Sequence, residues 1–196
     1  MNRLWSIVLT GLLALTAVVP VTVASPAAAG VPATRATADP APVGGPAAAA
    51  AVEVLSVRGA GPYRIGARLD RLAAAGLIDW TAPGCAGMLH AGATGAWAGV
   101  ILLAFRDGRL VSVGTATVPS SPAGASVGMS FAELERIYGR RGALIRNDAG
   151  NAEAYLVRFG SRVELFTGHP IRPGVGYFEA GPASYVERGF RQGPSC

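Results

Sequence analysis

The clearest hydrophobic pattern in the chain lies in residues 126–139. Its apolar positions recur three and four residues apart, which places them on one side of a helix; they are Phe131, Leu134, Ile137 and Tyr138. Ser130 and Glu133 have the spacing of a capping box, in which each side chain accepts a hydrogen bond from the other residue's backbone amide. Gly139 is a typical helix stop. The stretch therefore predicts a short, capped, amphipathic helix.

A weaker copy of this pattern occupies residues 63–77. Aligning Gly66 with Gly128 superposes the apolar positions that follow, so that Leu69 falls on Phe131 and Leu72 on Leu134. Arg68 stands where the second copy has Ser130, so we expect the first helix to lack a side-chain cap. Matches in the same order, about sixty residues apart, suggest an internal duplication. The alternative is a chance likeness between two amphipathic helices.

Strand-like runs follow each predicted helix. After the first helix, residues 97–105 and 110–115 flank Asp107-Gly108, a pair that predicts a hairpin with a type I′ turn. Trp80 and Cys85 are predicted to lie in a loop-rich stretch, and short strands are expected at 52–57 and 87–90. After the second helix, strands are expected at 142–145, 155–159, 162–166, 175–179 and 184–188.

This order of elements predicts an α+β fold. We expect two tandem units, about residues 52–118 and 119–196, each a short helix packed on antiparallel strands, which together form one sheet-and-helix domain. Residues 1–29 read as a signal peptide, with a long apolar run after Arg3 and small residues at Ala27 to Ala29. A retained membrane anchor is the alternative. Residues 30–51, rich in Ala and Pro, predict a disordered linker.

The composition predicts where the protein is located and argues against some classes of partner. The formal net charge is +5, and every basic residue is arginine apart from the two histidines. The arginines are interleaved with acids and form no basic run, so the pattern does not indicate nucleic-acid binding. With the signal cleaved, no segment is expected to span a membrane. The predicted location is extracytoplasmic, secreted or in the cell envelope.

The box Val127-Gly128-Met129-Ser130, followed by an amphipathic helix and Tyr138-Gly139, resembles a motif of small secreted actinobacterial proteins with tandem helix-and-sheet units. The arrangement is similar to the β-lactamase inhibitor protein fold and, more distantly, to outer-membrane assembly lipoproteins of the SmpA/OmlA type. The first copy departs from the motif at Ala67-Arg68, where the family has Met and then Ser or Thr. The resemblance implies an inhibitor-like or binding function.

Cys85 and Cys196 are the only cysteines. Two cysteines in an exported chain favour one disulfide. In the chain-entropy model, closing a loop of this length stabilises the fold by about 4–5 kcal/mol. The alternative is a catalytic or metal-binding thiol, but neither cysteine has a CxxC partner or a nearby histidine.

The chain carries no recognisable catalytic, cofactor or metal motif. His90 and His169 stand far apart without clustered carboxylates, and Ser130 lacks the glycines of a nucleophile elbow. Four acids are open to a glycosidase-like pairing, although no spacing selects two of them: Asp70, Asp79, Glu164 and Glu179. We therefore predict a protein that is not an enzyme and needs no cofactor.

Aromatic and arginine residues concentrate in the second half of the chain, a composition typical of binding hot spots. The face of the sheet away from the helices is expected to be open, and the candidate binding residues are Tyr155, Arg158, Phe166, Tyr177, Tyr185 and Arg188. The alternative is that these aromatics are core residues. The predicted function is secreted, non-enzymatic binding or inhibition of an extracellular or envelope protein. A cell-envelope structural factor and a small secreted hydrolase are the alternatives.

Overall fold

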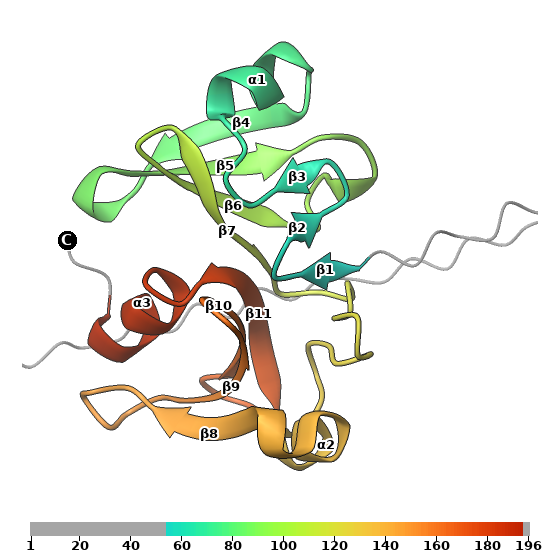
Figure 1. Ribbon diagram of the computed structural model, residues 1–196, viewed down its shortest axis with the longest axis vertical. Coiled ribbons are helices and arrows are strands. Elements are labelled where there is room, and N and C mark those ends of the chain that lie inside the picture. The colour runs from blue at the N-terminus through green and yellow to red at the C-terminus, as the bar shows by residue number, and fades with distance from the viewer. Residues whose placement is uncertain (1–53, 194–196) are drawn as a thin grey trace, which may run out of the picture. The chain divides into compact units, whose positions relative to one another are not determined.

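The computed structural model describes residues 54–193 (Figure 1). The predicted signal peptide, the predicted linker and Cys196 lie outside the described residues. The strands are β1 Leu55–Ser56, β2 Gly59–Ala60, β3 Tyr63–Arg64, β4 Ile78–Pro83, β5 Met88–Ala93, β6 Leu102–Arg106, β7 Arg109–Thr115, β8 Gly142–Arg146, β9 Glu153–Phe159, β10 Arg162–Gly168 and β11 Val175–Pro182. The α-helices are α1 Leu69–Ala74, α2 Phe131–Tyr138 and α3 Val186–Gln192.

Eight strands form one antiparallel sheet in the order β4-β5-β6-β7-β11-β10-β9-β8. Its two halves meet where β7 pairs with β11 through Thr115–Phe178, Gly114–Glu179 and Val113–Ala180. Strands β1 to β3 make a separate small sheet. The predicted α+β class with antiparallel strands is confirmed. In chain order α1 precedes β4 to β7, and α2 precedes β8 to β11 (Figure 1).

The main hydrophobic core covers the first face of the large sheet. There, side chains of β5, β6, β7 and β9 to β11 pack against β1 to β3 and the apolar sides of α1 and α2. Leu72 and Leu134, the matched positions of the two helix patterns, are both buried in this core. A second, smaller cluster lies on the opposite face, where Val186 of α3 packs on residues of β9 and β10. We refer to this opposite side as the second face.

The two helices begin as their sequences predict. Ser130 Oγ accepts a hydrogen bond from Glu133 N at 3.3 Å, and Glu133 Oε2 accepts one from Ser130 N at 2.7 Å, which confirms the capping box of α2. At α1 the N-cap residue is Arg68, whose side chain makes no cap hydrogen bond and instead pairs with Asp70. The missing cap of α1 is also confirmed.

Backbone hydrogen bonds tie the chain before each helix to a strand at the centre of the sheet. Gly66 and Gly128 have nearly the same left-handed backbone, with φ of 92° and 91°. Before α1, Gly66 N donates to Leu110 O at 2.7 Å and Leu110 N donates to Ala67 O at 2.9 Å. Before α2, the equivalent bonds run from Gly128 N to Val175 O at 2.9 Å and from Val175 N to Met129 O at 2.8 Å.

The predicted hairpin is confirmed. Asp107 and Gly108 both have positive φ, of 51° and 69°, as a type I′ turn requires, and Arg106 pairs with Arg109 across the turn. Strands are also present at the positions expected after the second helix, up to residue 179.

Three other expectations are corrected. Residues 78–83 form strand β4 where a loop was expected, and the strand expected to begin at Trp97 begins at Leu102, because Gly99 takes a positive φ of 69° and turns the chain. Residues 184–188 lead into helix α3 and are not a strand. The helix places Glu187 and Arg191 four residues apart, where they form an ion pair at 3.0 Å.

Within residues 54–193, no helix is both long enough and apolar enough to cross a bilayer.

Candidate functional site

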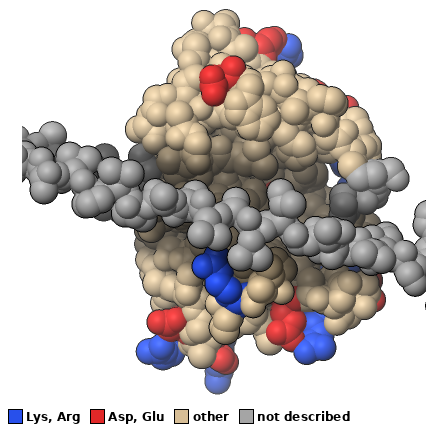
Figure 2. All heavy atoms as spheres, turned by 180° about the vertical axis from the view of Figure 1, so that it is seen from behind, with Lys and Arg blue, Asp and Glu red and all other residues tan. Residues whose placement is uncertain are grey.

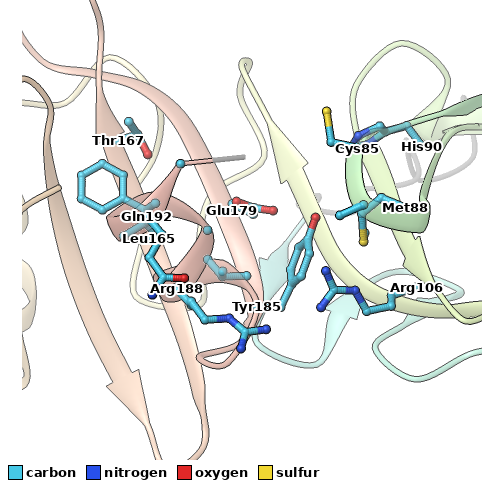
Figure 3. A pocket seen from close by; sticks show the side chains of 15 residues that line it. Cys85, Met88, His90, Arg106, Leu165, Thr167, Glu179, Tyr185, Arg188 and Gln192 are labelled. Carbon is cyan, nitrogen blue, oxygen red and sulfur yellow. The ribbon is translucent and has the colours of Figure 1, made fainter. Parts of the chain in front are cut away.

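A groove of about 530 Å³ opens on the second face of the sheet, between β5 and β6 of one half and β11 and α3 of the other. Figure 3 shows Tyr185, at the start of α3, reaching toward the β5 side beside Arg106. The lining is a mixture of apolar, aromatic and charged side chains. It comprises Cys85, Ala86, Met88, His90, Arg106, Leu165, Thr167, Glu179, Tyr185, Val186, Arg188, Gly189, Phe190, Gln192 and Gly193.

Two arginines line this groove from opposite sides. The Arg106 guanidinium lies 5.6 Å from the centre of the Tyr185 ring, within the range of a cation–π interaction. Arg188 is exposed on α3 and lines the same groove (Figure 3). Within residues 54–193, neither arginine belongs to a salt bridge. The groove therefore presents two positive charges that no described carboxylate neutralises.

Glu179 lies in the floor of the groove, on β11. Burial raises the pKa of this carboxyl, and the nearby Ser112 hydroxyl partly opposes the rise. Tyr177 lies on the same face, two residues away, across Gly114 of the neighbouring strand. A Cβ atom at Gly114 would be 2.1 Å from the Tyr177 hydroxyl oxygen, so only glycine leaves room for the ring. Burial also raises the pKa of Tyr177.

His90 lines the β5 side of the groove and contains a polar atom without a partner. Its Nδ1 is buried and has no hydrogen bond with any described residue. The ring packs closely against Gly84, where a Cβ atom would lie 2.7 Å from Nε2. Because this nitrogen is itself buried, it is a rare unsatisfied polar atom beside the groove and not an exposed contact point.

The candidate binding residues from the sequence divide between the two faces. Tyr155 and Phe166 are buried in the main core, where the Phe166 ring lies 5.9 Å from that of Tyr138. Their assignment to an exposed binding surface is wrong, because both point to the face that α2 covers. Alternation along a strand shows which side chains share a face of the sheet. It does not show which of the two faces the helices cover, because that depends on the fold.

The other four candidates lie on the second face or at its edge. Tyr185 and Arg188 line the groove, whereas Tyr177 packs over Gly114 outside the lining, close enough to Glu179 and Tyr185 for both to affect its pKa. Arg158 lies apart from the groove and pairs with Glu187 of α3 at 2.6 Å. The structure thus brings Tyr185 and Arg188 together at the groove, with Tyr177 next to Tyr185.

The sequence missed the contribution of the first half of the chain to this groove, from Met88, His90 and Arg106. The alternation along residues 102–106 predicts that Arg106 lies on the face opposite Phe105. This pattern could not show that α3 lies beside Arg106, because the sequence of residues 184–188 predicts a strand.

The four acids considered for a glycosidase-like pair do not meet. On adjacent strands Glu164 pairs with Ala180 and Leu165 pairs with Glu179, so Glu164 and Glu179 point to opposite faces. Asp70 is held by Arg68 at 2.7 Å, and Asp79 is exposed on β4. Within the described part of the chain, no cluster of three or more His, Cys, Asp or Glu residues could bind a metal ion.

Glu164 belongs to a buried polar cluster on the first face. The Tyr138 hydroxyl lies 2.6 Å from both Glu164 Oε2 and Ser121 Oγ, and its single proton can serve only one of them at a time. Ser121 Oγ also accepts hydrogen bonds from the backbone amides of Ala123 and Ala125. Burial raises the pKa of Glu164 to about 7, against the opposing effects of the Tyr138 hydroxyl and the Arg141 charge.

Comparison with known proteins identifies no family. No protein-family model and no curated protein matches the sequence. Two solved structures show a weak likeness at 13% identity: a cysteine-rich secretory protein from Staphylococcus aureus subsp. aureus Mu50, with a TM-score of 0.41, and an extracellular protein containing an SCP domain from Bacillus anthracis str. Ames, with a TM-score of 0.39. The matches cover 65% of this chain but only 48% and 46% of those chains. The resemblance to β-lactamase inhibitor proteins stays a prediction.

Proposed function

We propose that this protein is a non-enzymatic binding protein that holds a segment of an extracellular or envelope protein in the groove between β5, β6 and α3. The observation that carries the proposal is the groove itself, about 530 Å³ in volume and lined by arginine, tyrosine, methionine and phenylalanine side chains. Its volume lies within the range of ligand sites. Its residue types are those enriched where proteins bind one another.

The groove also has the arrangement of a hot spot. Tyr185 supplies a large, rigid ring whose position is supported by Arg106, so little conformational entropy is lost when a partner packs on it. Met88 and Phe190 add apolar surface on the two sides. No specific feature favours either alternative, an envelope structural factor or a hydrolase.

We also propose that the fold consists of two tandem units, residues 52–118 and 119–196. Support comes from the repeated order of one helix followed by four neighbouring strands. The equivalent backbone hydrogen bonds before α1 and α2, and the matching φ angles of Gly66 and Gly128, add to it. Under this proposal the groove lies between the units, a common place for a ligand site.

The proposed setting is outside the cytoplasm, on the strength of the sequence of residues 1–29. Nucleic acid is not the proposed partner. On the face seen in Figure 2, basic and acidic side chains lie interspersed and form no continuous basic patch.

Selection of short random displayed peptides on the purified chain tests the binding function. Gly189 lines the groove, and a Cβ atom at this position would meet no atom within 4 Å. Gly189→Trp should therefore fill the groove without straining α3, and Gly189→Ala is the matched control. We expect selected peptides to bind the native protein and Gly189→Ala and to lose binding to Gly189→Trp.

Two outcomes would contradict the proposal. If no peptide is enriched on the native protein, the binding function fails. If enriched peptides bind Gly189→Trp as tightly as the native protein, binding occurs elsewhere on the surface and the groove is the wrong site.

A further inference from the structure

The groove has a charge imbalance that indicates what it binds. On α3, Glu187 pairs with both Arg158 and Arg191, at 2.6 and 3.0 Å. The third arginine of this region, Arg188, has no carboxylate partner within residues 54–193. Arg106 across the groove has its guanidinium 5.6 Å from the centre of the Tyr185 ring and likewise forms no salt bridge within residues 54–193. Glu187 thus pairs with two arginines beside the groove, and the two arginines that line it have no ion-pair partner among the described residues.

The remaining acid of the lining, Glu179, forms no salt bridge with either arginine within residues 54–193. It lies in the floor of the groove, where burial raises the pKa of its carboxyl and so disfavours the charged form.

The remainder of the lining mixes polar side chains, Thr167 and Gln192, with apolar ones. Met88 and Leu165 are already almost fully buried, so the partly exposed apolar surface of the groove belongs to Tyr185 and Phe190. A ligand that satisfied only the arginines would leave this surface in contact with water. A ligand with an apolar group next to its negative charge would cover both, and burial of the apolar group would add affinity.

We propose that the groove recognises an acidic segment of a partner protein in which Asp or Glu stands beside an aromatic or large aliphatic residue. The carboxylate lies between the guanidinium groups of Arg106 and Arg188, and the apolar neighbour packs on Tyr185 and Phe190. This inference rests on the proposed function and adds the chemical class of the ligand.

The test uses the peptides selected on the native protein, together with synthetic analogues in which each Asp or Glu is replaced by Asn or Gln. We expect acidic residues beside aromatic or aliphatic ones to be enriched, and the amide analogue to bind at least about 10-fold more weakly, the effect of losing one charge-assisted hydrogen bond. Arg106→Gln and Arg188→Gln should each weaken the acidic peptide about 10-fold. Arg140→Gln, an exposed arginine away from the groove, is the control and should change nothing.

If the arginines had only a structural role, replacing them would weaken both peptides equally. The informative quantity is therefore the ratio of the dissociation constants of the acidic and amide peptides. In the double variant, Arg106→Gln with Arg188→Gln, the acidic and amide peptides should bind equally. Arg188→Gln is expected to fold normally, because this side chain is exposed and forms no ion pair within the described residues. A loss of binding in this variant therefore reports on the charge.

Failure of this inference can be told from failure of the binding function. If peptides bind and Gly189→Trp blocks them, but acidic residues are not enriched or the amide analogue binds equally, the groove binds a different ligand class. If free phenylacetate displaces the peptide as effectively as an unlabelled acidic peptide does, the groove is a small-molecule site and the assignment to a protein segment is overturned.

Discussion

Replacing Glu164 by Gln should stabilise the protein at neutral and alkaline pH. Glu164 is 1% exposed, so its ionised form is placed among apolar side chains with Tyr138 and Ser121 as its polar neighbours. Gln has nearly the same volume, and its carbonyl oxygen can still accept the Tyr138 hydroxyl proton. The substitution therefore removes the buried charge and keeps the hydrogen bond.

The size of the effect follows from the two pKa values of Glu164. The folded pKa is about 7, and the ordinary value for an unfolded chain is 4.5. Because the folded value is the higher one, the folded state holds the proton over this range while the unfolded state has lost it. Stability conferred by the protonated acid is complete below about pH 4.5 and is lost as the pH rises toward 7. A difference of about 2.5 in pKa, at about 1.4 kcal/mol per pKa unit, gives a loss of about 3.5 kcal/mol.

The assay is urea unfolding of both proteins, followed by tryptophan fluorescence from about pH 5 to about pH 8. The native protein should lose up to about 3 kcal/mol more unfolding free energy over this range than Glu164→Gln. Glu179, whose pKa is also raised, is present in both proteins, so its contribution cancels in the comparison. Glu135→Gln, an exposed change on α2, is the control and should follow the native curve. Parallel curves for the native protein and Glu164→Gln would refute the reasoning.

Three further outcomes can be measured. Oxidised protein should gain about two daltons on reduction, and an unchanged mass would exclude the disulfide. Replacing Cys85 or Cys196 by Ser should lower the unfolding free energy by about 4–5 kcal/mol under oxidising conditions, but by much less after reduction. Ser130→Ala should destabilise the fold by about 1 kcal/mol through loss of the cap, whereas Arg68→Ser, which supplies the missing cap at α1, should stabilise it by up to about 1 kcal/mol. Gly189→Ala should raise the unfolding free energy by up to about 1 kcal/mol, because alanine favours a helix more than glycine does, and a lower thermal midpoint would contradict the open space around this position.

Elements with a local cause were predictable from the sequence. The Asp107-Gly108 turn and the Ser130 cap depend on backbone preferences and side chains within a few residues, and both are present. Helix α3 was not predictable in this way, because a run such as Ser184 to Arg188 suits a strand as well as a helix. Packing of Val186 on the second face and the ion pairs of Glu187 decide between them, and both depend on distant parts of the chain.

The candidate site was predictable only in part, for the same reason. The sequence indicated that aromatic and arginine residues of the second half form a surface, and Tyr185 and Arg188 do line a groove. It could not separate them from Phe166, which is stacked at 4.3 Å on Phe178 inside the core. That distinction requires the register of three strands and knowledge of which face the helices cover. Arg106, from the first half, could not be joined to the site before the β7–β11 pairing was known.

The groove exists because the two halves of the sheet are joined asymmetrically. The equivalent hydrogen bonds before α1 and α2 relate the halves, and both helices lie on the first face. Helix α3 belongs only to the second half and lies on the second face, with no counterpart after β7 among the described elements. It therefore covers only one half of that face, and the groove opens along its edge, with Arg106 and Met88 on the far side. If the fold arose by duplication, the binding site proposed here is a property of the joined pair, since neither unit alone would place an arginine on each side of Tyr185.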